Sequence, residues 1–135
     1  MGARANTEIV ESAYDAMNRR DMRAFLAVID RDVEWRASNR GTDPDTYIGQ
    51  AGVDRFLDTR LDVWDELVQE PGEMVESGEK VVAVVDVRAK GRGSGIEVSE
   101  RAFHLWELRD GRVVRFETFD DETSLRAAAG VPDSS

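Results

Sequence analysis

The dipeptide Asp110-Gly111 stands between two apolar-rich segments, and it constrains the fold more than any other feature of the sequence. Asp-Gly between alternating apolar residues is the strongest short-range signal of a β-hairpin. A hairpin determines which side chains project together, because successive residues of a strand point to opposite faces of the sheet. The first strand of this hairpin carries the only histidine of the chain, His104, so its neighbours on that face can be predicted.

We expect the hairpin to close through a three-residue loop, 109–111, with a type I turn followed by Gly111 in the left-handed conformation. In that register the levels of His104 and Asp120 lie about 13 Å apart along the strands, too far for direct contact. The facing pairs on one side of the sheet would be Leu108 with Arg112, Trp106 with Val114, His104 with Phe116, Ala102 with Thr118 and Glu100 with Asp120.

A two-residue type I′ turn is the alternative register. It would place His104 opposite Glu117 and Trp106 opposite Arg115, which would create an imidazole–carboxylate pair suited to proton transfer. We favour the three-residue loop because it leaves Arg115 and Glu117 on the outer face and puts Phe116 inside with His104.

The composition is that of a globular protein, with 135 residues of which 41% are hydrophobic and 34% charged. This length predicts one domain, 1–135, with loose termini at 1–6 and 131–135. The net charge of −10 argues against nucleic acid or an anionic membrane as a partner. Apolar runs are too short for a membrane span, and we expect a cytoplasmic protein.

The periodicity of apolar residues predicts helices in the first half of the chain and strands in the second. Asp21 is the expected N-cap of the second helix, and Pro71-Gly72 the expected end of the third. The predicted helices are 7–19, 22–29, 50–70 and 121–129, the predicted strands are 33–37, 73–76, 80–89, 96–108 and 112–119, and 38–48 is the longest predicted loop. This order predicts an α+β fold with a sheet curled around the helices.

Four motifs carry a family resemblance: Asn18-Arg19-Arg20-Asp21, Asp32-Val33-Glu34-Trp35, and the segments 47–53 and 104–116. Over about residues 7–129 the chain resembles the SnoaL-like branch of the nuclear-transport-factor-2-like (cystatin-like) superfamily. The resemblance implies a cone in which a curved antiparallel or mixed sheet wraps around three N-terminal helices and an apolar pocket. It also implies a homodimer.

If this resemblance holds, the hairpin face that carries His104 lines the pocket. The other expected pocket residues are Tyr14, Trp35, Trp64, Trp106, Phe116, Thr118 and Asp120. The opposite face would expose a row of apolar side chains, which makes it the expected dimer interface. That row is Phe103, Leu105, Val113 and Phe119.

His104 is the first candidate for proton transfer, because imidazole titrates near neutral pH. A buried structural histidine, or a neutral hydrogen-bond donor, is the other interpretation. With one histidine and no cysteine, we expect no metal and no cofactor.

The resemblance also aligns family positions with residues of this chain. The family's carboxylate on the last strand aligns with Thr118, the base of ketosteroid isomerase aligns near Ala37, and its oxyanion-stabilising acid aligns with His104. Neither Thr118 nor Ala37 can serve as the base. Asp86 resembles a catalytic acid of the epoxide hydrolases, although we favour the interpretation that it points outward beside Arg88.

Three functions fit these observations. The first is a cofactor-independent acid–base enzyme of cyclase, isomerase, dehydratase or hydrolase type, acting on an apolar oxygenated small molecule. The second is a non-catalytic protein that binds a small ligand in the same pocket. The third is a protein-interaction module, which would have a filled pocket and an exposed apolar patch.

Overall fold

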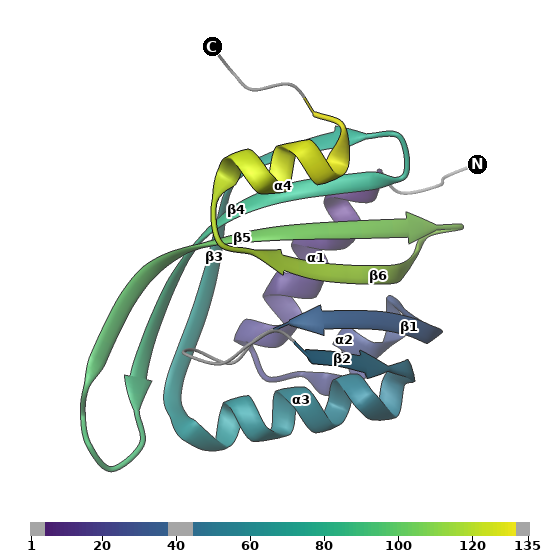
Figure 1. Ribbon diagram of the computed structural model, residues 1–135. Helices are drawn as coiled ribbons and strands as arrows, with labels where there is room; N and C mark the ends of the chain where they lie inside the picture. Colours follow the sequence, from purple (N-terminus) through teal and green to yellow (C-terminus); the bar gives the residue numbers. More distant parts are fainter. Residues whose placement is uncertain (1–4, 38–44, 132–135) are drawn as a thin grey trace.

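The computed structural model describes residues 5–37 and 45–131, which form an α+β fold (Figure 1). The helices are α1 (Asn6–Asn18), α2 (Met22–Ala27), α3 (Gly49–Val63) and α4 (Glu122–Ala129). The strands are β1 (Ile29–Ala37), β2 (Asp45–Ile48), β3 (Trp64–Ser77), β4 (Lys80–Gly91), β5 (Glu97–Arg109) and β6 (Arg112–Phe119).

The strands form one six-stranded sheet in the order β2-β1-β6-β5-β4-β3. Only the β1–β6 pair is parallel, so the sheet is mixed, as expected. Strands β3, β4 and β5 bend sharply and run toward the C-terminal end of α3 (Figure 1). The inner face of the bent strands is therefore turned toward α3 (Figure 1).

The two faces of the sheet bury separate apolar clusters. Helices α1, α2 and α3 cover the inner face, where most of the buried residues gather, and α4 covers part of the outer face (Figure 1). The predicted N-cap of the second helix is confirmed, since the Asp21 carboxylate accepts a hydrogen bond from the Ala24 N–H. In α4 the corresponding residue is Asp121, which accepts from Ser124.

The side chain of Asn18 joins the end of α1 to strand β3. Its amide nitrogen donates to the Gln69 carbonyl at 2.8 Å, and its amide oxygen accepts from the Gln69 N–H at 2.9 Å. Arg20, two residues later and in the left-handed conformation (φ 57°), donates to the carbonyls of Trp64 and Asp65. These contacts seat the turn between α1 and α2 on the β3 backbone.

The third helix is shorter than the sequence predicts. It ends at Val63, and residues 64–70 belong to β3 instead of the helix. The apolar spacing of Trp64, Leu67 and Val68 fits a helix, yet Leu67 and Gln69 are buried with a strand's alternation. Pro71-Gly72 then lies inside β3, where the pairing with β4 shifts register, and does not end a helix.

Other boundaries also differ from the prediction. Part of the predicted loop 38–48 forms β2, and the remainder, 38–44, lies outside the described residues. The first strand begins at Ile29, earlier than expected. Helix α1 begins at Asn6 and the buried Val131 donates to the Arg126 carbonyl, so both ends pack slightly further than expected.

The β5–β6 hairpin adopts neither predicted register. Asp110 (φ 51°) and Gly111 (φ 78°) are both left-handed, which defines a two-residue type I′ turn, and Arg109 pairs with Arg112. A bulge at Val114 then shifts the register, because Leu108 pairs with Val113 while Glu107 pairs with Arg115. The facing pairs beyond the bulge are Trp106 with Phe116, Leu105 with Glu117, His104 with Thr118 and Phe103 with Phe119.

Because of the bulge, the side chains beyond it lie on the sheet faces that the sequence predicts, although each residue of β5 pairs with a different residue of β6. An extra residue in one strand reverses the alternation beyond it, so His104 and Phe116 still share the inner face. Val113, on the turn side of the bulge, points inward and is fully buried in the main core instead of the outer row. Leu105 is on the outer face but buried beneath α4, whereas Phe103 and Phe119 remain half-buried there.

No helix within residues 5–37 and 45–131 is long and apolar enough to cross a membrane.

Candidate functional site

A cavity of about 630 Å³ lies between the inner face of the bent sheet and the C-terminal end of α3. Its walls combine apolar and polar surface in similar amounts. The apolar lining residues are Val63, Trp64, Leu67, Val87, Ala89, Val98, Ala102, Phe103 and Phe119, and the polar ones are Thr59, Glu100, Arg101, His104, Thr118 and Asp120.

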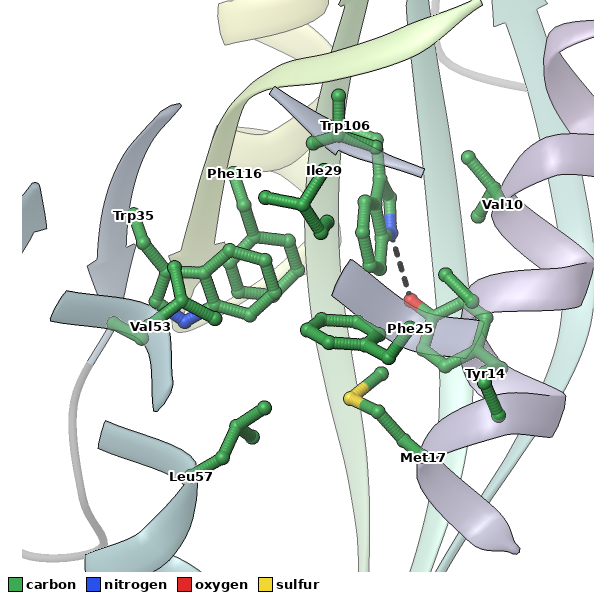
Figure 2. Close-up of a cluster of buried hydrophobic side chains, with 14 of the residues drawn as sticks. Val10, Tyr14, Met17, Phe25, Ile29, Trp35, Val53, Leu57, Trp106 and Phe116 are labelled. Atoms are coloured by element: carbon green, nitrogen blue, oxygen red, sulfur yellow. Dashed lines mark hydrogen bonds between the residues drawn. The ribbon is translucent and has the colours of Figure 1, made fainter. Parts of the chain in front are cut away.

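His104 is the most buried polar side chain of this lining, with 6% of its surface exposed. Its Nδ1 atom lies 2.6 Å from the Tyr14 hydroxyl, and the Trp106 Nε1–H donates to the same hydroxyl at 2.9 Å. Figure 2 shows the hydrogen bond between Trp106 and Tyr14 as a dashed line among the buried side chains. Helix α1 and strand β5 therefore hold the imidazole together, although Tyr14 and His104 are 90 positions apart.

The direction of these hydrogen bonds follows from the donors available. An indole N–H can only donate, so the Tyr14 oxygen accepts from Trp106 and its own proton is directed to Nδ1 of His104. Burial raises the pKa of the Tyr14 hydroxyl far above its usual value, and the bond from Trp106 only partly opposes this. Tyr14 therefore keeps its proton, and its bond to Nδ1 favours the neutral tautomer of His104 that carries the ring proton on Nε2.

Four of the predicted pocket residues form the core beneath the cavity and do not line it. Trp35 stacks on Phe116 with ring centroids 4.0 Å apart, and Trp106 packs edge-on against both rings (Figure 2). Tyr14 is the fourth, and it is 1% exposed. The sequence indicates that these aromatics face inward, but it does not indicate that they fill the interior themselves.

The other predicted pocket residues do line the cavity. Trp64 stands at the start of β3, Thr118 lies directly opposite His104, and Asp120 follows the end of β6. Glu100 also lines the cavity and is exposed. The expected pairing of Glu100 with Asp120 is wrong, because the bulge shifts β6 relative to β5.

Asp86 lies on the outer face of the sheet, away from the cavity. Its carboxylate is 3.7 Å from the guanidinium of Arg101 on the neighbouring strand, and both side chains are about two-thirds exposed. The inward position that a catalytic acid would need is therefore wrong for Asp86. The partner is Arg101 instead of Arg88, which lies near Glu70.

Within residues 5–37 and 45–131, no group of three or more histidine, cysteine, aspartate or glutamate side chains could hold a metal ion.

The sequence analysis did not predict the part of the cavity wall that lies at α3. Thr59, Val63 and Leu67 contribute to it, and Leu67 does so only because β3 starts where a helix was expected. Facing them, the tip of the β4–β5 hairpin is tied to α3 by Arg92, whose side chain donates to the Asp62 carbonyl at 3.0 Å. A cation at a helix C-terminus is favourable, and the single signal in the sequence was this arginine inside a glycine-rich turn.

Solved structures of similar fold support this architecture. The chain is 27% identical to an NTF2-like protein of unknown function from Burkholderia pseudomallei, with a TM-score of 0.77 and coverage of 92% of this chain and 96% of that chain. It is 26% identical to TerC, co-crystallised with polyporic acid, with a TM-score of 0.76 and coverage of 93% and 98%.

A third structure supports the fold alone. It is a protein of unknown function with a cystatin-like fold from Xanthomonas campestris, at 19% identity, a TM-score of 0.75 and coverage of 96% and 100%. No match was found among curated proteins.

The family comparison agrees with the resemblance seen in the sequence. The SnoaL-like domain matches residues 10–116, which contain most of α1, the sheet except its last residues, and His104. The mixed curved sheet and the helices on its inner face are those expected of this fold. The chain belongs to the SnoaL-like domain family.

Proposed function

We propose that this protein binds an apolar, oxygenated small molecule in the cavity and acts on it by acid–base chemistry without a cofactor. The observation that carries the proposal is the buried chain Trp106–Tyr14–His104, which holds the imidazole in the wall of the cavity. A neutral imidazole with a fixed tautomer can polarise a carbonyl, as the imidazole of triosephosphate isomerase does.

The size and lining of the cavity support a ligand of this kind. A volume of about 630 Å³ lies within the usual range for small-molecule sites. Valine, alanine and leucine side chains would surround the apolar body of the ligand, and His104 and Thr118 would meet its oxygen. TerC was crystallised with polyporic acid, and its similarity to this chain makes that compound a reasonable first probe.

The second candidate is a non-catalytic protein that binds a ligand of the same class. Thr118 favours it, because this hydroxyl lies opposite His104 at a position where the family's enzymes carry a carboxylate, and threonine is no base at neutral pH. In that case the donor Nε2–H would orient the ligand and no proton would move.

We place this activity in the cytoplasm on the evidence of the sequence alone. We further propose a homodimer formed through the outer sheet face. Phe103 and Phe119 support it because they stay half-buried beside the part of that face that α4 covers; both residues also border the cavity.

The test is a titration with polyporic acid followed by quenching of tryptophan fluorescence, since Trp64 lines the cavity. We expect saturable binding that His104→Gln weakens by about 1–3 kcal/mol, because the ligand oxygen loses its buried donor. The matched control is Ser99→Ala, an exposed change on the outer face. Equal affinity of the wild type and His104→Gln would contradict the role of His104.

A further inference from the structure

Strand β5 extends beyond the end of β6 and has an open edge there. The last pair between the two strands is Phe103 with Phe119, because the chain then leaves the sheet and begins α4 with Asp121 as the N-cap. On its other side, β5 stays paired with β4 as far as Glu97. Among the described residues, no strand therefore pairs with the edge of β5 that faces away from β4 between 97 and 102.

Two backbone hydrogen bonds show which residues of this segment direct their N–H and C=O groups to the open edge. At the two ends of the β4–β5 ladder, Leu108 donates to the Glu79 carbonyl at 2.8 Å and Gly91 donates to the Ile96 carbonyl at 2.7 Å. In an antiparallel ladder, the residues that bond the same neighbour alternate along the strand. The ladder has no register shift, so the even-numbered residues of β5 bond β4 and the odd-numbered ones direct their backbone groups the other way. The odd-numbered residues of the unpaired segment are Glu97, Ser99 and Arg101.

Of these three residues, only Arg101 lines the cavity. Its side chain lies on the outer face of the sheet, where the guanidinium is 3.7 Å from the Asp86 carboxylate. What Arg101 offers the cavity is therefore its main chain, with one donor and one acceptor side by side. Backbone groups at an open sheet edge are ready to bond a partner that carries the complementary pair.

We infer that the main-chain N–H and C=O of Arg101 form a binding subsite of the cavity for a planar lactam. In a lactam ring the C=O and N–H lie on the same side, so the ligand carbonyl accepts from the Arg101 N–H and the ligand N–H donates to the Arg101 carbonyl. Val98 and Ala102 lie on either side of Arg101 along β5, line the cavity and pack against the main core, so they supply apolar contacts for the ring. The inference rests on the proposed function, because it names the class of ligand that this cavity takes.

The experiment follows the backbone amides of the whole chain by ¹H–¹⁵N NMR during a titration with 2-quinolone, an apolar bicyclic lactam. Without ligand, the Arg101 N–H should exchange rapidly with D₂O, whereas the Glu100 N–H, which bonds β4, should be protected. We expect saturable binding that shifts the Arg101 N–H signal and slows its exchange. N-methyl-2-quinolone keeps the ring and the carbonyl but lacks the donor, so it should bind about ten-fold more weakly.

Proline substitutions test the main chain of β5 directly, because proline has no N–H. Arg101→Pro removes a donor that does not bond β4, so we expect a folded variant that binds 2-quinolone about ten-fold more weakly than the wild type. Arg101→Ala loses the ion pair with Asp86 but keeps the N–H, and it should bind like the wild type. Ser99→Pro is the matched control, since its N–H faces the same edge outside the cavity lining. Melting curves establish that each variant is folded, and the comparison of the two quinolones needs no variant.

Three outcomes would overturn the inference. They are equal affinity for the two quinolones, equal affinity of Arg101→Pro and Arg101→Ala, and an Arg101 amide that is protected without ligand, as it would be if another segment or a second copy covered the edge. Absence of 2-quinolone binding while polyporic acid still quenches the tryptophan fluorescence would also overturn it and would leave the proposed function intact. Binding of neither compound would be a failure of the proposed function, and the inference would fail with it.

Discussion

The Tyr14 hydroxyl on α1 lies 2.6 Å from Nδ1 of His104 on β5, and this contact sets the orientation of the only imidazole in the protein. The Tyr14 oxygen accepts a hydrogen bond from the Trp106 Nε1–H, and its own proton can then be donated to His104. Tyr14, which does not line the cavity, thus contacts one of the two ring nitrogens of His104 from beneath.

Replacing Tyr14 with phenylalanine should release the tautomer of His104 while keeping the ring in place. We expect ¹⁵N NMR of the single imidazole to show mainly the Nε2–H form in the wild type and a mixture of tautomers in Tyr14→Phe. The free energy of unfolding should fall by about 1–3 kcal/mol, because Trp106 and His104 lose a buried partner. An unchanged tautomer would show that Tyr14 does not direct it.

The two fully buried tryptophans provide a matched pair for the same hydrogen bond. Trp106 donates to Tyr14, whereas the Trp35 N–H is buried with no hydrogen-bond partner among the described residues. Both substitutions to phenylalanine remove similar volume, so Trp106→Phe should cost about 1–3 kcal/mol more than Trp35→Phe in urea unfolding. Equal costs would mean that the Trp106 bond contributes nothing net.

The N-cap of α4 should give the protein a pH-dependent component of stability. Hydrogen bonds from the Ser124 backbone and side chain hold the pKa of the Asp121 carboxyl below its ordinary value of 3.8. A lowered pKa means that the stabilisation is present above the unfolded-state value and is lost as the pH falls through the folded-state value. The melting temperature of Asp121→Ala should therefore lie below that of the wild type at pH 7.

That difference should shrink below pH 3.8 as the wild-type carboxylate takes up its proton. Asp121→Asn is the control, because asparagine caps a helix without titrating. A difference between the wild type and Asp121→Ala that stays constant down to pH 2 would show that the charged cap is unimportant.

The proposed dimer can be tested without disturbing the cavity. Val84 lies on the outer face beside Phe103, with which it pairs across β4 and β5. We expect the wild type to sediment as a dimer at micromolar concentration and Val84→Glu as a folded monomer, because a buried unpaired carboxylate opposes association. A wild-type monomer, or a dimer built wholly from helices, would contradict the proposal.

Local signals in the sequence predict most of this fold, because they act within a few residues. Asp21 as a cap, Asp110-Gly111 as a turn, and the alternation in β4 and β5 each depend on adjacent positions. The failures come from features that depend on tertiary packing. The segment around Trp64 and Leu67 fits two periodicities, and only pairing with β4 makes it a strand.

The candidate site shows the same division. The sequence places His104 and Thr118 on one face, and that remains true in the structure. It cannot reveal the bulge at Val114, which depends on how β6 pairs with both β1 and β5, and the pairing of His104 with Thr118 follows from that bulge. Equally, nothing in the sequence indicates that Tyr14 contacts His104 beneath the cavity.

The paired hydrogen bonds between Asn18 and Gln69 have a consequence for association between molecules. β3 is an outermost strand, and its unpaired backbone groups could otherwise accept a strand from a second molecule. At Gln69 the side-chain amide of Asn18 already occupies both the N–H and the carbonyl, as a neighbouring strand would. At this position Asn18 therefore takes the place of a neighbouring strand, so a second molecule cannot pair with the sheet edge at Gln69.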